Sequence, residues 1–268
     1  MEQMEQVRVL VHGILGKMGQ EVLLALCRDP ELEAVAGVDI KVGKSDLLLP
    51  DGYRSIPLST DLESTLVRHH ADVLVDFTTA EATMTAVRTA VKNHVHLVIG
   101  TTGLSAGDLN EIESLCRKQE VGAVVAPNFA IAAVVMMHLA KISAKFFDYA
   151  EIIEMHHEQK LDAPSGTALA TARGMIEARG RNFIHAITKK ESIVGSRGGE
   201  LGGVALHSVR LPGLLAHQEV ILGAVGQTLR IRLDQINREA FMPGVILAIK
   251  KVPELKEAVF GLDTLLGF

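Results

Sequence analysis

The segment VRVLVHGILGKMGQEVLLALCR (residues 7–28) decides the fold class of this chain. It begins with a short apolar run typical of a buried strand, passes through Gly13, Gly16 and Gly19, and ends in a stretch with helical spacing of apolar residues. When a strand, a glycine turn and a helix follow in this order, amides at the helix start can approach the pyrophosphate of a dinucleotide. The segment therefore predicts a dinucleotide-binding unit.

An acidic residue further along supports this prediction. Asp39 ends the apolar run at residues 34–38, about twenty residues after the glycine turn, where a carboxylate would bind the ribose hydroxyls. A solvated strand end is the alternative interpretation. Leu15 replaces the second glycine of the G-x-G-x-x-G pattern, so the turn alone is a weak signal. Lys41 and Lys44 could meet a 2′-phosphate, which leaves the choice between NADH and NADPH open.

The first half of the chain alternates strand and helix patterns. Strands near residues 7, 34, 72, 95 and 121, with helices near 20, 81 and 105, predict a Rossmann-type doubly wound parallel sheet. Ligands bind such a sheet at the carboxyl ends of its strands. Gly100, Thr101 and Thr102 follow one of these strands and are expected at the ligand crevice. The A-P-N-F segment at residues 126–129 follows the next strand, and a turn at a domain boundary is its alternative interpretation.

The second half has a different pattern, which predicts an α+β domain with a mixed, largely antiparallel sheet. Its expected elements are a helix at 132–144, a strand from 149, a helix from 165, strands at 204–210, 217–224 and 228–235, and a helix at 241–252. The glycine-rich, charged segment 189–203 is expected to be a mobile loop. We predict a first domain at residues 1–128, completed by 239–268, and a second domain at 129–238.

The segment EMHHEQKLDAPSGTAL (residues 154–169) carries the chemistry of the second domain. His156 and His157 end a predicted strand and point to opposite faces, so only one imidazole is expected to face a given cleft. An imidazole can transfer a proton near neutrality, and Lys160 supplies a positive charge that a carboxylate would seek. A metal site is not expected, because Leu161 stands where the second histidine of H-E-x-x-H would be.

A helix start follows in the same segment. Ser165, Gly166 and Thr167 come after Pro164, and free amides beside two hydroxyls would form a cradle for a carboxylate. A structural histidine and an ordinary helix entry are the alternative interpretations of these features. Their convergence predicts a site for a small, compact anion beside a proton donor.

Composition limits the possible classes. The 268 residues are 48% hydrophobic, which indicates a globular protein with a large core or two domains. A net charge of −5, no long basic run and no tryptophan argue against a nucleic-acid partner. No run approaches the length of a membrane span, and the acidic, polar start is unlike a signal peptide, so we expect a cytoplasmic protein. Cys27 and Cys116 both fall in helical patterns and are expected to serve packing.

These motifs together resemble the bacterial dihydrodipicolinate reductase family over nearly the whole chain. The resemblance rests on H-H-x-x-K-x-D-A-P-S-G-T-A from residue 156, with the flanking motifs G-x-x-G-x-M-G, V-D-F-T, G-T-T-G and A-P-N-F in order. It implies reduction of 4-hydroxy-tetrahydrodipicolinate by NADH or NADPH with loss of water, in diaminopimelate and lysine biosynthesis. It also implies a homotetramer formed through the sheet of the substrate-binding second domain.

The resemblance also implies roles for individual residues. His156 corresponds to the general acid and Lys160 to its partner donor. The substrate carboxylates would be held by His157, Lys160, Ser165, Gly166, Thr167 and Thr102. The cofactor would be surrounded by Gly13, Gly16, Lys17, Met18, Gly19, Asp39, Gly100, Thr101, Thr102, Ala126 and Phe129. Ile40 stands where some members carry an arginine suited to a 2′-phosphate, so a strong NADPH preference is not expected.

Two other classes remain open. One is another nucleotide-dependent oxidoreductase, of homoserine or semialdehyde dehydrogenase type. A semialdehyde dehydrogenase would need an exposed catalytic cysteine in a turn, whereas both cysteines here lie in helical patterns. The other is a cofactor-binding sensor without catalysis, which would have no need of a proton donor beside an anion cradle.

Overall fold

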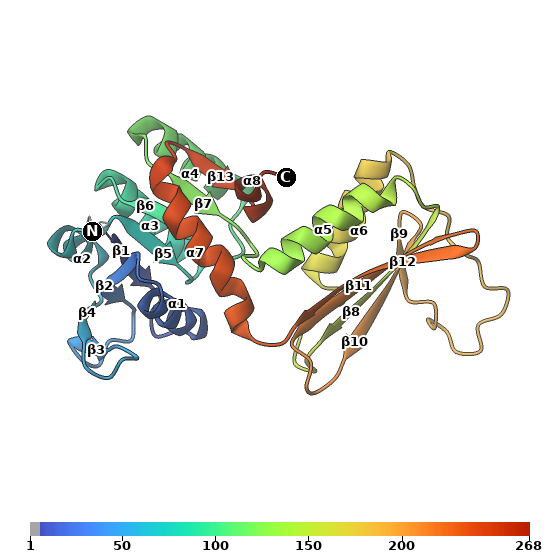
Figure 1. Ribbon diagram of the computed structural model, residues 1–268, viewed down its shortest axis with the longest axis horizontal. Helices are drawn as coiled ribbons and strands as arrows, with labels where there is room; N and C mark the ends of the chain where they lie inside the picture. The colour runs from blue at the N-terminus through green and yellow to red at the C-terminus, as the bar shows by residue number, and fades with distance from the viewer. Residues whose placement is uncertain (1–5) are drawn as a thin grey trace. The chain divides into compact units, whose positions relative to one another are not determined.

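The computed structural model describes residues 6–268, and these form two units (Figure 1). The first unit contains the chain up to Ile131 together with Phe241–Phe268, and the second contains Ala132–Ala240. Within the described residues, no helix combines the length and the apolar character needed to cross a membrane.

The first unit is built on an eight-stranded sheet in the order β13-β7-β6-β5-β1-β2-β4-β3. Neighbouring strands run parallel, except that β3 is antiparallel to β4. The strands are β1 (Val7–His12), β2 (Leu32–Val38), β3 (Asp46–Leu48), β4 (Ser55–Ser59), β5 (Val73–Asp76), β6 (His96–Ile99), β7 (Ala123–Val125) and β13 (Ala258–Phe260). Since β1 lies between β2 and β5, the strand order reverses there, and a ligand crevice is expected at the carboxyl ends of these strands.

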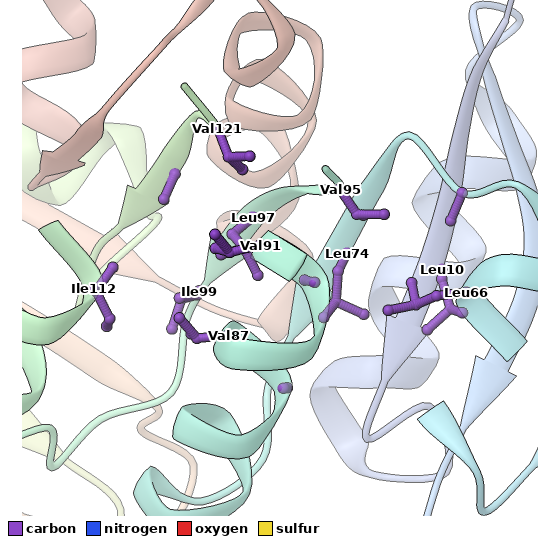
Figure 2. Packing of buried hydrophobic residues seen from close by; sticks show 14 of the residues in the cluster. Leu10, Leu66, Leu74, Val87, Val91, Val95, Leu97, Ile99, Ile112 and Val121 are labelled. Atoms are coloured by element: carbon purple, nitrogen blue, oxygen red, sulfur yellow. The ribbon is translucent and has the colours of Figure 1, made fainter. Parts of the chain in front are cut away.

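The helices of this unit are α1 (Lys17–Arg28), α2 (Leu62–His69), α3 (Ala80–Lys92), α4 (Ala106–Gln119), α7 (Met242–Lys251) and α8 (Leu262–Leu266). A short 3-10 turn follows α7 at Val252–Glu254, and another at Arg238–Phe241 lies where the chain returns from the second unit. Residues of α2, α3 and α4 pack on the strands in one apolar core, part of which Figure 2 shows. All four residues of β5 are buried, as expected of a parallel strand covered on both faces. The predicted parallel α/β class is confirmed.

The second unit has a five-stranded sheet in the order β12-β11-β8-β10-β9. Its elements are α5 (Ile131–Ala144), β8 (Tyr149–His156), α6 (Gly166–Arg179), β9 (Gly199–Leu201), β10 (Val204–Arg210), β11 (Ala216–Ala224) and β12 (Gln227–Gln235). Only β8 and β10 pair in parallel, so the sheet is mixed and largely antiparallel, as predicted. The helices α5 and α6 share a core with Ile152, Val220 and Leu222 of the sheet.

Several elements were not predicted from the sequence. The segment expected to be a loop at residues 189–203 ends in β9, which pairs with β10. The first unit also contains β3, β4, α2 and β13, none of which was expected. The strand β13 has three residues and gains its structure by pairing with β7 at the sheet edge. A strand this short has too few residues to show a period.

The glycine turn between β1 and α1 permits a close approach of backbone atoms. Gly13 has a φ of +80°, which favours glycine. A Cβ atom added at Gly19 would lie 2.2 Å from the carbonyl oxygen of Gly13. The glycine turn and the first residues of α1 therefore lie so close together that only the hydrogen atom of a glycine fits at Gly19.

We predict that Gly19→Ala lowers the free energy of unfolding by about 1–3 kcal/mol, because the overpacked methyl group outweighs the better helix propensity of alanine. Gly107→Ala in α4 is the matched control, because the nearest heavy atom to its Cβ would be Ser105 Oγ at 3.6 Å. Urea unfolding of both variants measures the difference. Equal stabilities would show that the turn yields without cost.

Candidate active site

The start of α1 is open to an anionic ligand. Gly16 is the N-cap residue and makes no side-chain cap, and the first turn of α1 contains no acidic residue. Lys17 is the first residue of the helix. The amides of a helix start carry a partial positive charge, and here neither a hydroxyl nor a carboxylate occupies them. Together with the crowded glycines, this arrangement fits the pyrophosphate of a dinucleotide.

Asp39 lies beside this turn, directly after β2. Its Oδ2 accepts a hydrogen bond from the Leu15 amide at 3.0 Å, and its Oδ1 accepts one from the Lys41 amide at 3.2 Å. The backbone thus holds the carboxylate against the glycine turn. The structure brings the two predicted features, the turn and the acidic strand end, into contact.

A hollow of about 660 Å³ lies at the carboxyl ends of β1 and β2, and we name it the β1–β2 crevice. Its walls come from the ends of these strands, from the segment between β4 and α2, and from one side of α3. The charged residues and histidine lining it are His12, Asp39, Asp61, Glu63 and Glu81. Its volume falls in the range typical of small-molecule sites. Sequence reasoning identified only Asp39 among these residues.

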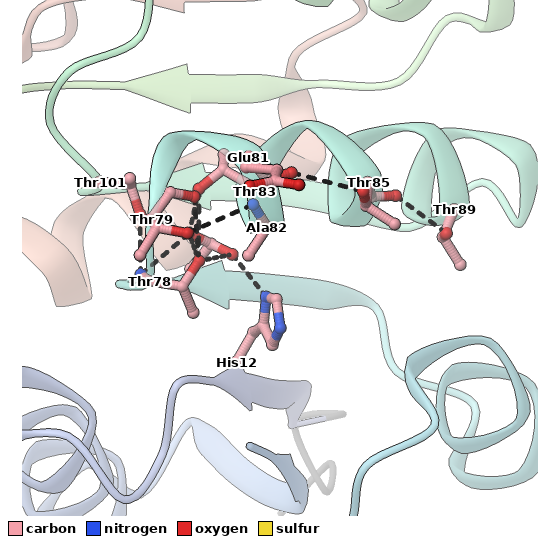
Figure 3. Close-up of polar contacts among 10 residues, drawn as sticks. His12, Thr78, Thr79, Glu81, Ala82, Thr83, Thr85, Thr89 and Thr101 are labelled. Atoms are coloured by element: carbon pink, nitrogen blue, oxygen red, sulfur yellow. Dashed lines mark hydrogen bonds and ion pairs between the residues drawn. The ribbon is translucent and has the colours of Figure 1, made fainter. Parts of the chain in front are cut away.

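A buried carboxylate joins β1, β5 and the end of β6 beside the crevice. Asp76 is fully buried, and its Oδ2 lies 2.6 Å from Nδ1 of His12 (Figure 3). The hydroxyls of Thr78, Thr83 and Thr101 donate to the same carboxylate. Burial acts to raise the pKa of Asp76, but the bonds from His12 and the threonines outweigh it, so the pKa is lowered. The hydroxyl of Thr101 therefore points to Asp76, and neither His12 nor Asp76 had been predicted as part of the site.

The remaining predicted cofactor residues differ in exposure. Gly100 lies against Phe77, whose ring would be 2.0 Å from an added Cβ. Ala126 and Phe129 are buried, and the ring of Phe129 lies 6.0 Å from that of Phe77, centroid to centroid. Thr102 is exposed. These residues line up at the ends of β5, β6 and β7, where the sequence predicted them.

In the second unit, a buried carboxylate holds His156. Oε2 of Glu154 lies 2.5 Å from Nδ1 of His156, and the Glu154 side chain is 1% exposed. The two residues are two positions apart on β8 and so lie on the same face of the sheet. The contact fixes the ring and leaves its other nitrogen, Nε2, for a ligand.

Arg210 completes this cluster. In the parallel ladder it lies directly opposite His156. Its Nη1 and Nη2 donate to the two oxygens of Glu154 at 2.9 and 2.7 Å, and Nη2 also donates to the Asp162 carbonyl oxygen. Burial acts to raise the pKa of Glu154, but hydrogen bonds from Arg210, Ser208 and His156 lower it overall. Glu154 is therefore held as a carboxylate.

The pKa of His156 is lowered. Burial is the largest cause, and the hydrogen bond to Glu154 opposes it. The positive charges of Lys160 and Arg210 lower the pKa further. A protonated His156 consequently releases its proton more readily than an ordinary imidazole.

The predicted anion cradle lies against the same cluster. Ser165 caps α6 by accepting a hydrogen bond from the Ala168 amide, and its own amide donates to Oε1 of Glu154 at 3.3 Å. Gly166 has open space where a Cβ would stand, and the first turn of α6 contains no acidic residue. Lys160 Nζ donates to Asp162 Oδ1 at 2.7 Å and remains 22% exposed. The structure thus brings His156, Lys160 and the helix start together within one unit.

Sequence reasoning did not identify Glu154, Ser208 or Arg210 as parts of this site. An acidic residue two positions before a histidine on a strand was an available signal for Glu154, because such residues share a face. Arg210 is 56 residues from Glu154, so no local pattern joins them. Their pairing depends on the register of β8 with β10.

The chain matches known sequences over nearly its whole length. The family model described as "Dihydrodipicolinate reductase, N-terminus" matches residues 7–129, and the one described as "Dihydrodipicolinate reductase, C-terminus" matches residues 132–266. A 4-hydroxy-tetrahydrodipicolinate reductase of Dehalococcoides mccartyi is 53% identical over 263 residues, covering 98% of this chain and 99% of the relative. One of Syntrophomonas wolfei is 49% identical over 265 residues, with coverages of 98% and 99%.

Solved structures give the same result. Dipicolinate-bound dihydrodipicolinate reductase from a Paenisporosarcina species superposes with a TM-score of 0.87 at 42% identity, covering 97% of this chain and 99% of the other. An amine dehydrogenase from Mycobacterium smegmatis has a TM-score of 0.65 at 15% identity, which is a likeness of fold alone. The resemblance noted in the sequence is confirmed, and the chain belongs to the dihydrodipicolinate reductase family.

Proposed function

We propose that this chain catalyses the reduction of 4-hydroxy-tetrahydrodipicolinate to tetrahydrodipicolinate, with loss of water, in diaminopimelate and lysine biosynthesis. The observation that carries the proposal is the His156–Glu154–Arg210 cluster against the start of α6, in a chain that matches the family over its full length. A proton donor beside an anion cradle is what reduction of a ring dicarboxylate requires.

The first unit binds the reductant, which is NADH or NADPH. The amides at the start of α1, with Lys17 and Met18, hold the pyrophosphate, and Asp39 takes ribose hydroxyls. Gly13 lets the glycine turn approach the Phe77 carbonyl oxygen, and Gly19 lets α1 approach the turn, so the turn keeps the shape that presents its amides to the cofactor. When bound, the nicotinamide supplies the hydride that adds to a conjugated double bond of the substrate.

The second unit binds the substrate. The amides of Gly166 and Thr167 and the hydroxyls around the start of α6 receive one carboxylate, and His157 and Lys160 attract the other. The relative from the Paenisporosarcina species was solved with dipicolinate, a planar ring with two carboxylates, and this supports a dicarboxylate ligand here. Holding the ring at both ends orients the carbon that accepts the proton.

His156 donates that proton. Glu154 receives the Nδ1 hydrogen, so Nε2 is the nitrogen that delivers a proton to the substrate carbon. Burial and the nearby cations lower the pKa of His156, which makes it a stronger acid. General acid catalysis of this kind contributes about a hundred- to ten-thousand-fold in rate.

The cysteines argue against a semialdehyde dehydrogenase. Cys116 is buried in α4, and burial raises its pKa to about 11. Cys27 lies in α1, and burial raises its pKa as well. A catalytic thiol needs a lowered pKa, because the thiolate is the nucleophile.

We further propose that the chain assembles as a homotetramer through the sheet of the second unit. The helices α5 and α6 pack on the face that carries Ile152 and Val220. Ile153 and Ile221 lie on the opposite face, which is available to a second copy.

Light scattering tests this assembly and should give about four times the 28.9 kDa of one chain. A single-chain mass would refute the assembly.

The activity is tested by following nicotinamide absorbance with the freshly made product of dihydrodipicolinate synthase, and separately with homoserine. Oxidation of the cofactor is expected only with the former.

His156→Gln should lower turnover about a hundredfold or more, with little change in cofactor affinity. His185→Gln, in the same unit, is the control and should retain turnover. Unaltered turnover in His156→Gln would remove the acid role.

The pH profile tests the role of Glu154. The reaction needs a protonated His156, and the pKa of this residue is lower than that of an ordinary imidazole. The value of kcat/KM should therefore fall as pH rises through this lowered pKa. Glu154 acts to raise that pKa, so Glu154→Gln should move the descending limb to lower pH. Ser208→Ala removes a bond to Glu154 without a change of charge and should move the limb far less. A limb that stays in place or moves to higher pH in Glu154→Gln contradicts the assignment.

A further inference from the structure

The β1–β2 crevice is lined mainly by negative charge. Asp39, Asp61, Glu63 and Glu81 lie around it, and among the described residues that line it none is a lysine or an arginine. Lys92 pairs with Glu63 at 2.6 Å and offsets one of these carboxylates. Hydrogen bonds from the Ser64 amide and hydroxyl lower the pKa of Asp61, so it stays ionised. A 2′-phosphate group entering the crevice would meet the carboxylates of Asp39, Asp61 and Glu81, and of these three the charge of Arg68 partly offsets that of Asp61.

His12 does not supply the missing positive charge. It is the one basic side chain among the described lining residues, and its Nδ1 lies 2.6 Å from the carboxylate of the buried Asp76. Any positive charge on its ring is therefore paired locally. A lowered pKa keeps Asp76 ionised, so this pairing is maintained.

The helix starts that face the crevice are already capped. Asp61 accepts a hydrogen bond from the Ser64 amide at the start of α2, and Thr79 accepts one from the Ala82 amide at the start of α3. The start of α1 differs, because Gly16 makes no side-chain cap. Backbone amides that could bind a phosphate group are therefore open at the glycine turn, whereas the helix starts at the crevice already have amides bonded to side chains.

The two lysines that could have met a 2′-phosphate do not line the crevice. Lys41 contacts Asp39 through its backbone amide, which donates a hydrogen bond to the carboxylate. Ile40, which does line the crevice, is 85% exposed and uncharged. The residues that follow β2, Asp39 and Ile40, therefore offer a carboxylate and an apolar side chain where a 2′-phosphate would need a cation.

From these observations we propose that the β1–β2 crevice accepts an adenosine ribose with a free 2′-hydroxyl and rejects a 2′-phosphate, so that the chain uses NADH in preference to NADPH. This inference rests on the proposed function, because it assigns the cofactor of the same site. Asp39 receives the hydroxyl, and the charges of Asp61 and Glu81 repel the extra phosphate. Glu81 is the specificity-determining residue best suited to substitution, because it lines the crevice and is exposed.

The test is a pair of fluorescence titrations, with NADH and with NADPH, on the wild-type chain without substrate. We expect NADH to bind at least about tenfold more tightly. Glu81→Lys should tighten NADPH binding about threefold or more while NADH changes little. Glu33→Lys, at the other end of β2, makes the same change of charge away from the crevice and should leave the ratio unaltered. Raising the salt concentration should narrow the wild-type ratio.

If the lysine variants fold poorly, Glu81→Gln and its control Glu33→Gln repeat the comparison. Glu81→Gln should then tighten NADPH binding by a smaller factor than Glu81→Lys, and Glu33→Gln should leave the ratio unaltered. Equal affinities, or tighter binding of NADPH, overturn the inference, and persistent turnover with NADPH would leave the proposed function standing. A preference for NADH that none of the Glu81 variants alters overturns its electrostatic basis. Failure of both cofactors to bind overturns the inference and the proposed function together.

Discussion

Burying the carboxylate of Glu154 would cost several kcal/mol if it had no partners, and the proposed substrate site of the second unit is arranged around satisfying it. Arg210 binds both oxygens, the Ser165 amide binds one, and His156 binds the other. These partners come from β10, from the start of α6 and from β8 itself. One buried charge thereby holds the proposed proton donor and the proposed anion cradle in a single arrangement.

The first unit uses a buried carboxylate in a different way. Asp76 gathers three threonine hydroxyls and His12, and so ties the carboxyl ends of β1, β5 and β6 together. Most of its donors are uncharged hydroxyls, which have no proton to exchange near neutrality. The result is a buried hydrogen-bond network beside the crevice. The proposed cofactor site of the first unit is thus preorganised by hydroxyls, and the proposed substrate site of the second unit by charges.

Local patterns in the sequence were sufficient to predict the strand ends, turns and helix starts that carry many of the proposed site residues. The glycine turn, Asp39, His156 and the Ser165 helix start each have a signature within a few residues, and their surroundings in the structure match it. The Glu154–Arg210 pair and the carboxylate lining of the crevice join segments that are far apart, so their recognition requires strand register. Short strands such as β13 depend on a neighbouring edge and have no signature of their own.

The division of labour between Glu154 and His156 follows from Arg210. A carboxylate in contact with an imidazole can compete with it for the proton, and a buried one does so more strongly because burial favours its neutral form. The two hydrogen bonds from Arg210 reverse this tendency and lower the pKa of Glu154, so the proton remains on the ring. The same guanidinium, with Lys160, lowers the pKa of His156 and eases release of the proton from Nε2. Arg210 therefore acts on the proposed acid both directly and through Glu154, without a need to touch the substrate.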